Sequence, residues 1–270
     1  MNPEPATLPV RDASEPKRCP GFAASVGALW TLFWGALCTG RRVPWLLALL
    51  FLQPVFAWFS IPDQREGALL EWTANLYLGL MIPIYCLMTG GGLIRDETQA
   101  GTLGYLLTRP VSRARIFLGK YLCQLFWGEI ILGANSLFLV VVAYVRGVES
   151  WLSIAPVLLL TQLFVVPAFL AISALLGLIS RRYVVLGVVY GFLVEVGIGQ
   201  IPTNINVLSV SRHARTLMAN STAFADRFGW EAEGTLWSVA SLLIITAVFL
   251  VLGTIWFTLR EFSGPEEEKK

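Results

Sequence analysis

The chain has 270 residues, of which 56% are hydrophobic and 14% are charged, and its formal net charge is +2. Soluble domains carry about 25% charged residues, so this composition, with several apolar runs long enough to cross a bilayer, excludes an ordinary soluble domain. The small net charge gives no support for a nucleic-acid-binding protein. The apolar runs do not alternate as barrel strands do, so the sequence predicts an all-α integral membrane protein.

The N-terminal part divides into two segments. Residues 1–20 are polar and rich in proline, which predicts a disordered cytosolic tail without a cleavable signal peptide. Residues 21–42 carry large apolar side chains on one helical face and small side chains on the other, so we expect an interfacial amphipathic helix. The alternative is that Phe22–Gly40 forms a seventh span, packed by its small face.

Residues 43–260 are expected to form a transmembrane domain of six helices. The expected spans are Val43–Ile61, Leu69–Ile94, Ile116–Val145, Ala155–Ile179, Val184–Ile201 and Thr235–Leu259. Lys and Arg are enriched in cytosolic loops. With the N-terminus inside, 15 of the 20 Lys and Arg residues are cytosolic, which predicts that both termini lie inside (N-in/C-in). Residues 261–270 then form a charged cytosolic tail.

The longest loop outside the membrane is residues 202–234, on the predicted outer side. Val207, Val210 and Leu217 recur at helical spacing, with His213 or Ala214 between them, so a short amphipathic helix is expected there. His213 is the single histidine of the chain and has no cysteine or carboxylate partner in view. We therefore expect it to be a surface residue.

A charged, turn-rich stretch, LIRDETQAGTLGYLLTRPVSRARIFLGKYL, interrupts the apolar sequence from Leu93 to Leu122. Small residues precede it at Thr89–Gly92 and permit close helix packing or a hinge. Within the cytosolic segment 95–115, Thr102 can cap a short helix that Pro110 ends. The apolar face of that helix consists of Leu103, Leu106 and Leu107. Exposed leucines on so short a helix indicate a partner surface.

The same stretch resembles the signature region of ABC-2 type transporter permeases, the membrane subunits of ATP-binding-cassette transporters. The resemblance rests on an acidic pair, Gly-Thr-Leu, Leu-Leu, Pro and Gly-Lys, which here are Asp96, Glu97, Gly101, Thr102, Leu103, Leu106, Leu107, Pro110, Gly119 and Lys120. The predicted layout of interface helix, six spans and long outer loop is also similar to that family. The resemblance implies that Leu93–Pro110 contains a coupling helix that docks on a separate ATPase subunit.

The expected partners follow from this resemblance and from one missing motif. The chain has no G-x-x-x-x-G-K-[ST] phosphate loop, and its single Gly-Lys is Gly119–Lys120, so it should not hydrolyse ATP itself. The resemblance implies two copies of an ABC ATPase that bind ATP and Mg, and a second permease subunit, either an identical copy or a paralogue. It also implies a multi-pass protein of a prokaryotic inner membrane that moves a substrate, with export favoured. No cofactor or metal is expected in this chain.

Two carboxylates lie deep in expected spans, Glu129 in the third and Glu195 in the fifth. A carboxylate at that depth costs a few kcal/mol unless it is paired, protonated or faces water. One interpretation is that both, with Tyr190, line a translocation path for a cationic or polar substrate. The alternative is a structural hydrogen bond to Tyr190, Asn135 or Gln162. Both interpretations remain open from the sequence.

Other functions were weighed against transport. Met81, Cys86, Met88 and Cys123 could form a soft-metal path, but such residues are ordinary apolar fillers of helix interfaces. One alternative is an ATP-driven stator or assembly subunit that moves no substrate. Another is an intramembrane enzyme that uses Glu129 or Glu195, which the absence of HExxH, GxSxG and paired aspartates disfavours.

Overall fold

The computed structural model describes residues 54–60, 66–99, 111–197, 207–232 and 234–260, and the single positions 27, 30, 31 and 52. Every regular element within these residues is helical, as the composition predicted. The elements are α3 (Glu66–Glu71), η1 (Trp72–Met81), α4 (Ile82–Gly91), α5 (Arg95–Gln99), α7 (Arg113–Val145), α8 (Trp151–Ile179), α9 (Tyr183–Tyr190), η2 (Gly191–Gly197), α10 (Val210–Met218), α11 (Thr222–Phe228) and α12 (Thr235–Leu259).

Four helices are long and apolar enough to cross a membrane: Glu66–Gly91, Arg113–Val145, Trp151–Ile179 and Thr235–Leu259. They confirm the predicted second, third, fourth and sixth spans. The predicted fifth span, Val184–Ile201, corresponds to a shorter apolar helix, and the last residues of that prediction fall outside the described part of the chain. The first predicted span, Val43–Ile61, is described only at residues 52 and 54–60, which are helical, and the predicted interfacial helix, residues 21–42, only at residues 27, 30 and 31.

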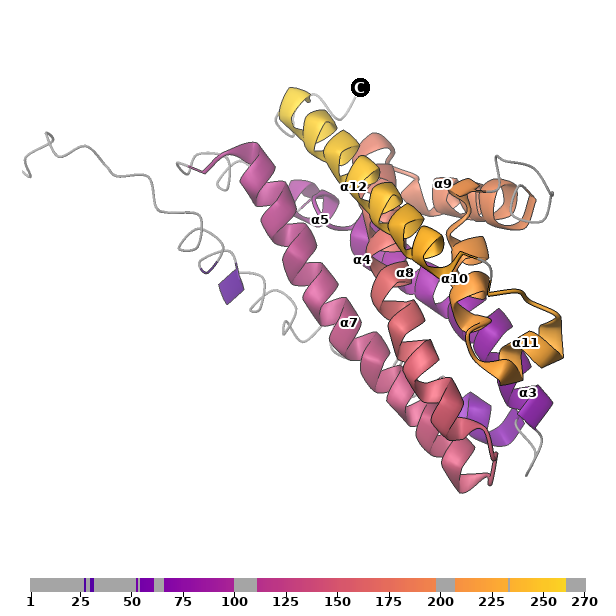
Figure 1. Cartoon of the computed structure of the whole chain (residues 1–270). Coiled ribbons are helices and arrows are strands. Elements are labelled where there is room, and N and C mark those ends of the chain that lie inside the picture. Colours follow the sequence, from indigo (N-terminus) through magenta and orange to yellow (C-terminus); the bar gives the residue numbers. More distant parts are fainter. Residues whose placement is uncertain are drawn as a thin grey trace, which may run out of the picture.

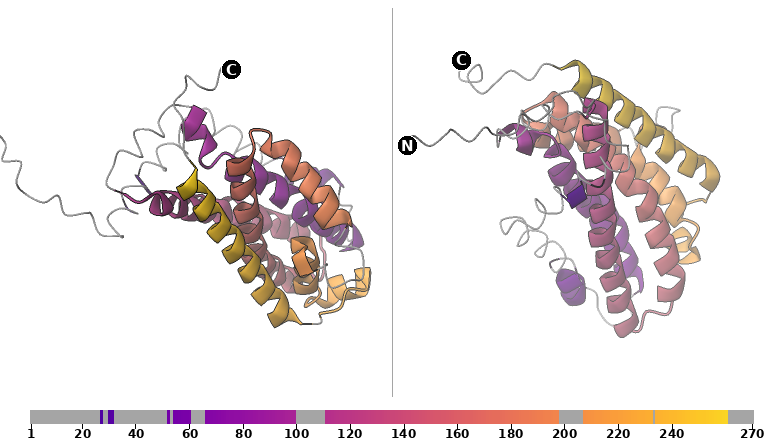
Figure 2. Two further views of the ribbon diagram at one scale, coloured as in Figure 1. Left: turned by 90° about the horizontal axis from the view of Figure 1, so that it is seen from above. Right: turned by 90° about the vertical axis from the view of Figure 1, so that its left-hand side faces the viewer.

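The long helices run side by side, with α8 packed between α4, α7 and α12 (Figure 1). One end of the bundle carries α5, the start of α7 and the end of α12, and we call it the α5 end. The opposite end carries α3, α11 and the turn between α7 and α8, and we call it the α11 end (Figures 1 and 2). Helix α10 packs along α8 and α12, so the loop after the fifth span returns to the bundle.

Two segments adopt π-helical rather than α-helical geometry. The first, η1, joins α3 to α4 within one continuous rod, and the backbone N–H of Ile82 donates to the carbonyl oxygen of Tyr77, five residues earlier. The second, η2, follows α9 directly. Segments of π-helix are rare and are frequently found at functional sites. Both π-helical segments therefore indicate where a functional site is expected.

Glycines bring α4 and α8 into backbone contact near the α5 end. A Cβ atom on Gly177 would lie 2.1 Å from the carbonyl oxygen of Gly91, and one on Gly90 would lie 2.9 Å from Cβ of Ser173. No side chain larger than hydrogen fits at Gly177 without moving a backbone. The predicted role of Thr89–Gly92 in close helix packing is confirmed.

Candidate functional site

The structure describes only part of the predicted coupling segment. Asp96 and Glu97 belong to α5, and the Asp96 side chain is exposed. The other predicted docking residues lie outside the described part of the chain, namely Gly101, Thr102, Leu103, Leu106, Leu107 and Pro110. The sequence missed the helix formed by Arg95–Gln99, because five polar residues show no apolar periodicity.

Two cations tie the backbone around α5 to the neighbouring spans. Arg95 Nη1 donates to the carbonyl oxygen of Ser180, at 2.9 Å, and its guanidinium lies 6.0 Å from the ring centroid of Tyr183. Lys120 Nζ, on α7, donates to the carbonyl oxygen of Leu93 at 3.0 Å, and its side chain is buried. Charge-assisted hydrogen bonds of this kind are stronger than neutral ones. A displacement of α5 therefore acts directly on α7 and on the junction of α8 with α9.

The C-terminal ends of α8 and α12 are joined at the same end of the bundle. Arg260 donates from Nη1 to the carbonyl oxygen of Leu178. Arg113 Nη1 donates to the carbonyl oxygens of Thr258 and Arg260, at 3.3 and 3.0 Å. Arginines here satisfy carbonyls that the last helical turns leave without a donor. The α5 end is thus interlocked across α7, α8 and α12.

A polar cluster lies between η1, α7 and α8. Tyr77 Oη is 2.8 Å from the carbonyl oxygen of Leu132, 2.7 Å from Ser136 Oγ and 2.7 Å from Gln162 Oε1. Gln162 Nε2 donates to Glu129 Oε2 at 3.2 Å, so Gln162 is the neighbour that Glu129 meets. The other carboxylate oxygen, Oε1, is buried and has no hydrogen-bond partner among the described residues.

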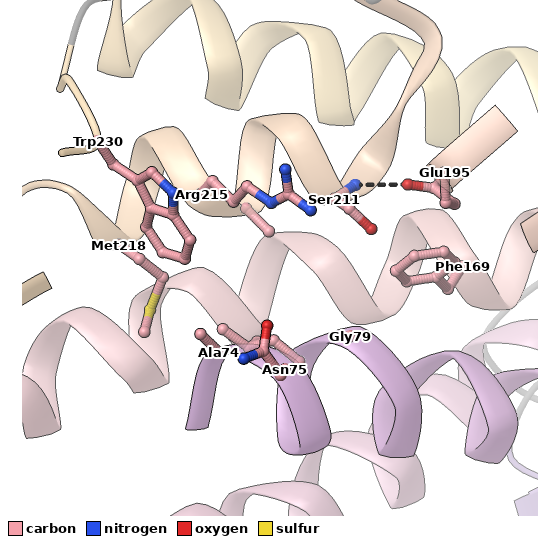
Figure 3. A pocket seen from close by; sticks show the side chains of 11 residues that line it. Ala74, Asn75, Gly79, Phe169, Glu195, Ser211, Arg215, Met218 and Trp230 are labelled. Atoms are coloured by element: carbon pink, nitrogen blue, oxygen red, sulfur yellow. Dashed lines mark hydrogen bonds between the residues drawn. The ribbon is translucent and has the colours of Figure 1, made fainter. Parts of the chain in front are cut away.

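Glu195 in η2 accepts four hydrogen bonds, three of them from the start of α10. Ser209 Oγ donates to Oε2 at 2.9 Å and Val210 N to Oε1 at 3.2 Å. Ser211 N donates to Oε2 at 2.8 Å (Figure 3). Tyr190 Oη donates to Oε1 at 3.1 Å. A carboxylate at a helix N-terminus meets both unpaired N–H groups and the positive end of the helix dipole. Glu195 therefore anchors α10 to η2.

Sequence reasoning identified one of these partners and missed three. Tyr190 was named because it lies five residues from Glu195 on the same span. Ser209, Val210 and Ser211 belong to another element, and the intervening residues carry no signal that brings the two together. The one sequence signal is Ser209 itself, because serine favours the position just before a helix. In the structure Ser209 caps α10 by accepting from the backbone N–H of Arg212 at 3.2 Å.

Helix α10 confirms the predicted amphipathic helix in the loop, with Val210, His213, Ala214 and Leu217 buried against the bundle. The expectation that His213 is a surface residue was wrong. Its side chain is only 3% exposed, and Nε2 lies 2.9 Å from the carbonyl oxygen of Val207. The backbone carbonyl of Val207 serves as the hydrogen-bond partner of the His213 ring. Sequence periodicity could not reveal this partner because it is a backbone group.

A cavity of about 220 Å³ lies between η1, α8 and α10. In Figure 3, Met218 extends from α10 toward Ala74 of η1 and Arg215 runs along α10 toward Ser211, with Trp230 at one side and Glu195 at the other. A second cavity, of about 300 Å³, lies between the helix η1–α4 and the helix α9–η2. Both cavities are lined by residues of the two π-helical segments.

The sequence of the chain is similar to that of known membrane proteins. The model of a family described as "ABC-2 family transporter protein" matches residues 41–197, more than half of the chain. The chain belongs to this family. Two relatives, both named "Probable ABC transporter permease protein NosY", come from Pseudomonas aeruginosa and Stutzerimonas stutzeri. They are 30% and 29% identical over 133 residues, which cover 45% of this chain and 48% of each relative. The chain thus spans about half the length of these relatives.

The ABC-2 family match includes most of the features described above. The segment α5, the contact between Gly91 and Gly177 and the polar cluster around Gln162 all lie within it. It ends at residue 197, between Glu195 and the helix that Glu195 anchors. The second cavity lies almost wholly within the match, whereas α10 contributes Arg215 to the first cavity from outside it.

Proposed function

We propose that this chain is the permease subunit of an ATP-driven ABC transporter. A separate ATPase subunit hydrolyses ATP, and the permease couples this hydrolysis to the movement of a substrate, in the export direction. Membership of the ABC-2 family supports this function, as do the names of the two relatives. The substrate path forms between two permease subunits, either identical copies or paralogues.

The observation that carries the proposal is the interlocking of the α5 end. We assign ATPase docking to the coupling segment, with the residues Asp96, Glu97, Gly101, Thr102, Leu103, Leu106, Leu107 and Pro110. When ATP binding closes the ATPase dimer, this segment moves as a unit. Arg95 and Lys120 pass the motion to α8 and α7, and the contact between Gly91 and Gly177 passes it from α4 to α8. Close-packed backbones transmit displacement because they cannot deform continuously.

The remaining parts of the proposal concern location and partners. Both termini lie in the cytosol, and the protein resides in a bacterial inner membrane, which the two bacterial relatives support. ATP and Mg bind to the two ATPase copies and not to this chain. In this orientation the α5 end faces the cytosol and the α11 end faces outward.

The contacts of the two buried carboxylates bear on the alternative functions. Glu195 accepts four hydrogen bonds, and a carboxylate so fully engaged is a poor candidate for the acid or base of an intramembrane enzyme. Within the described residues, Glu129 accepts a hydrogen bond from Gln162 through one oxygen only. A stator or assembly subunit without a transported substrate would use the same coupling elements. A ligand-binding measurement separates that function from transport.

The test is copurification from the native host in mild detergent. We expect an ATPase subunit to accompany the unaltered chain and to be lost when Leu106→Asp is combined with Glu97→Arg, because this pair of changes reverses a charge and removes an apolar contact at the coupling segment. A matched control outside the coupling segment combines Leu208→Asp with Glu231→Arg, since both of these side chains are exposed.

The control pair should leave the ATPase bound. The proposal fails if a monodisperse, folded chain brings down no ATPase. The docking assignment fails if the ATPase stays bound to the coupling-segment variant, or if both variants lose it equally.

A further inference from the structure

The two cavities meet in the membrane domain and form one groove with two different arms. Gly79, Phe169, Glu195 and Ser211 line both of them. Gly79 has no side chain to separate the arms, and a Cβ atom there would meet only the carbonyl oxygen of Ala74, at 3.4 Å. The junction between the two arms is therefore open because Gly79 has no side chain.

The first arm is the cavity between η1–α4 and α9–η2; it is apolar and faces the lipid side of the bundle. Its walls include Leu80, Ile84, Val188 and Phe192, whose side chains are 49%, 44%, 51% and 69% exposed. These residues lie on opposite sides of the arm, on the η1–α4 rod and on α9–η2. Its volume of about 300 Å³ reaches the range of small-molecule sites, roughly 300–1,000 Å³. A hydrocarbon chain in this arm could enter sideways from the bilayer.

The second arm, the cavity between η1, α8 and α10, is more polar than the first and includes one positive charge, that of Arg215. The guanidinium of Arg215 makes no hydrogen bond or ion pair with the described part of the chain, and it lies 6.0 Å from the ring centroid of Trp230. Asn75, exposed on η1, lies on the opposite wall. The Glu195 carboxylate is turned to the start of α10, where four donors engage it. The arm therefore presents a guanidinium and an amide to an incoming head group.

We propose that this groove binds a lipid-like amphiphile with an anionic, phosphate-type head group. The hydrocarbon chain lies in the apolar arm, and the head group reaches Arg215 and Asn75 through the open junction at Gly79. Arginine suits this role because its planar guanidinium binds phosphate oxygens in pairs. The inference that the ligand is cargo rests on the proposed transport function, whereas binding itself does not.

The test uses the full chain in nanodiscs of phosphatidylcholine, with no ATPase present. Trace phosphatidic acid with a photoactivatable acyl chain is compared with diacylglycerol bearing the same chain, and labelled peptides are located by mass spectrometry. We expect phosphatidic acid to label residues 79–88 and 187–193. Arg215→Gln should reduce that labelling about tenfold, in line with the loss of a charge-assisted hydrogen bond. It should leave the weaker labelling by diacylglycerol unchanged.

Matched variants define the site. Arg212→Gln removes an exposed arginine from the same helix outside the groove, and it should have no effect. Gly79→Leu closes the junction and should reduce labelling by phosphatidic acid to the level of diacylglycerol. If a variant is not monodisperse, competition on the unaltered chain serves instead. Unlabelled phosphatidic acid should displace the probe, while diacylglycerol and inorganic phosphate should not.

Three outcomes would overturn the inference. Labelling spread evenly over all lipid-facing helices would indicate bulk lipid only. Equal labelling by the two probes would remove the role of the anionic head group. Displacement by inorganic phosphate as effective as that by phosphatidic acid would indicate a free-anion site. Because no ATPase takes part, failure here leaves the copurification result standing, and failure of copurification leaves lipid labelling intact.

Discussion

The α-hydrogen face of Gly177 lies directly against the carbonyl group of Gly91, close enough that a Cβ atom there would be 2.1 Å from the oxygen. Gly91 belongs to α4, the helix that precedes the coupling segment, and Gly177 belongs to α8, the most buried of the long helices. We predict that Gly177→Ala destabilises the protein by about 1–3 kcal/mol, because the backbones must separate. Thermal unfolding in detergent measures this.

The control for this pair is Gly133→Ala on α7, where the new Cβ would lie 3.7 Å from Gln162 Nε2, an ordinary contact. It should be neutral or slightly stabilising, since alanine favours the helix. Equal effects of the two substitutions would contradict the packing argument.

The anchoring of α10 predicts a local effect of Glu195. Glu195→Gln keeps one accepting oxygen but places an amide group among three donors from the start of α10. We expect amide exchange in residues 210–218 to increase about tenfold, for the loss of roughly 1.5 kcal/mol of charge-assisted hydrogen bonding. Hydrogen-exchange mass spectrometry measures it. Glu231→Gln, at an exposed carboxylate, should leave this exchange unchanged, and similar exchange in both variants would argue against anchoring.

Gln162 holds the polar cluster together, because it bonds to Tyr77 and Ser136 through one atom and to Glu129 through another. Gln162→Leu should cost about 2–4 kcal/mol of stability, since it strands several buried polar groups at once. Glu129→Gln should cost less, because the new amide oxygen still accepts from Gln162. Thermal unfolding of both variants gives the order, and the reverse order would show that Glu129, not Gln162, is central.

The burial of His213 predicts that the local stability of α10 depends on pH. Burial lowers the pKa of His213 below its ordinary value, with a smaller lowering by Arg212, while the Val207 carbonyl and Glu195 act in the opposite direction. At His213 the unfolded state then binds more protons than the folded state. The contribution of neutral His213 to folding stability is therefore complete above about pH 6.5 and decreases as the pH falls below that value. Exchange in α10, corrected for its intrinsic rate, should rise between about pH 7.5 and pH 5.5. His213→Gln should remove most of this rise.

The sequence predicted the long helices well because a membrane span depends on local composition. It also predicted α10, since Val210 and Leu217 reveal their face through spacing, although His213 was expected at the surface. It could not predict that Glu195 reaches α10 or that Gly177 meets Gly91, because these contacts join residues that local patterns do not relate. The π-helical segments were missed for another reason. Residues 72–81 are mostly apolar, with Thr73 and Asn75 as the polar exceptions, and such a sequence does not distinguish one helical hydrogen-bond register from another.

The link between Glu195 and α10 also bears on what counts as one inherited unit in this protein. Similarity to the ABC-2 family stops at residue 197, yet three of the four donors to Glu195 are contributed by residues 209–211. A fragment that ended at residue 197 would retain the Glu195 carboxylate and lose three of the four groups that donate hydrogen bonds to it. The matched segment therefore depends on hydrogen bonds from residues outside the match. A substitution that removed Glu195 in a relative would be expected to accompany a change at the start of its α10.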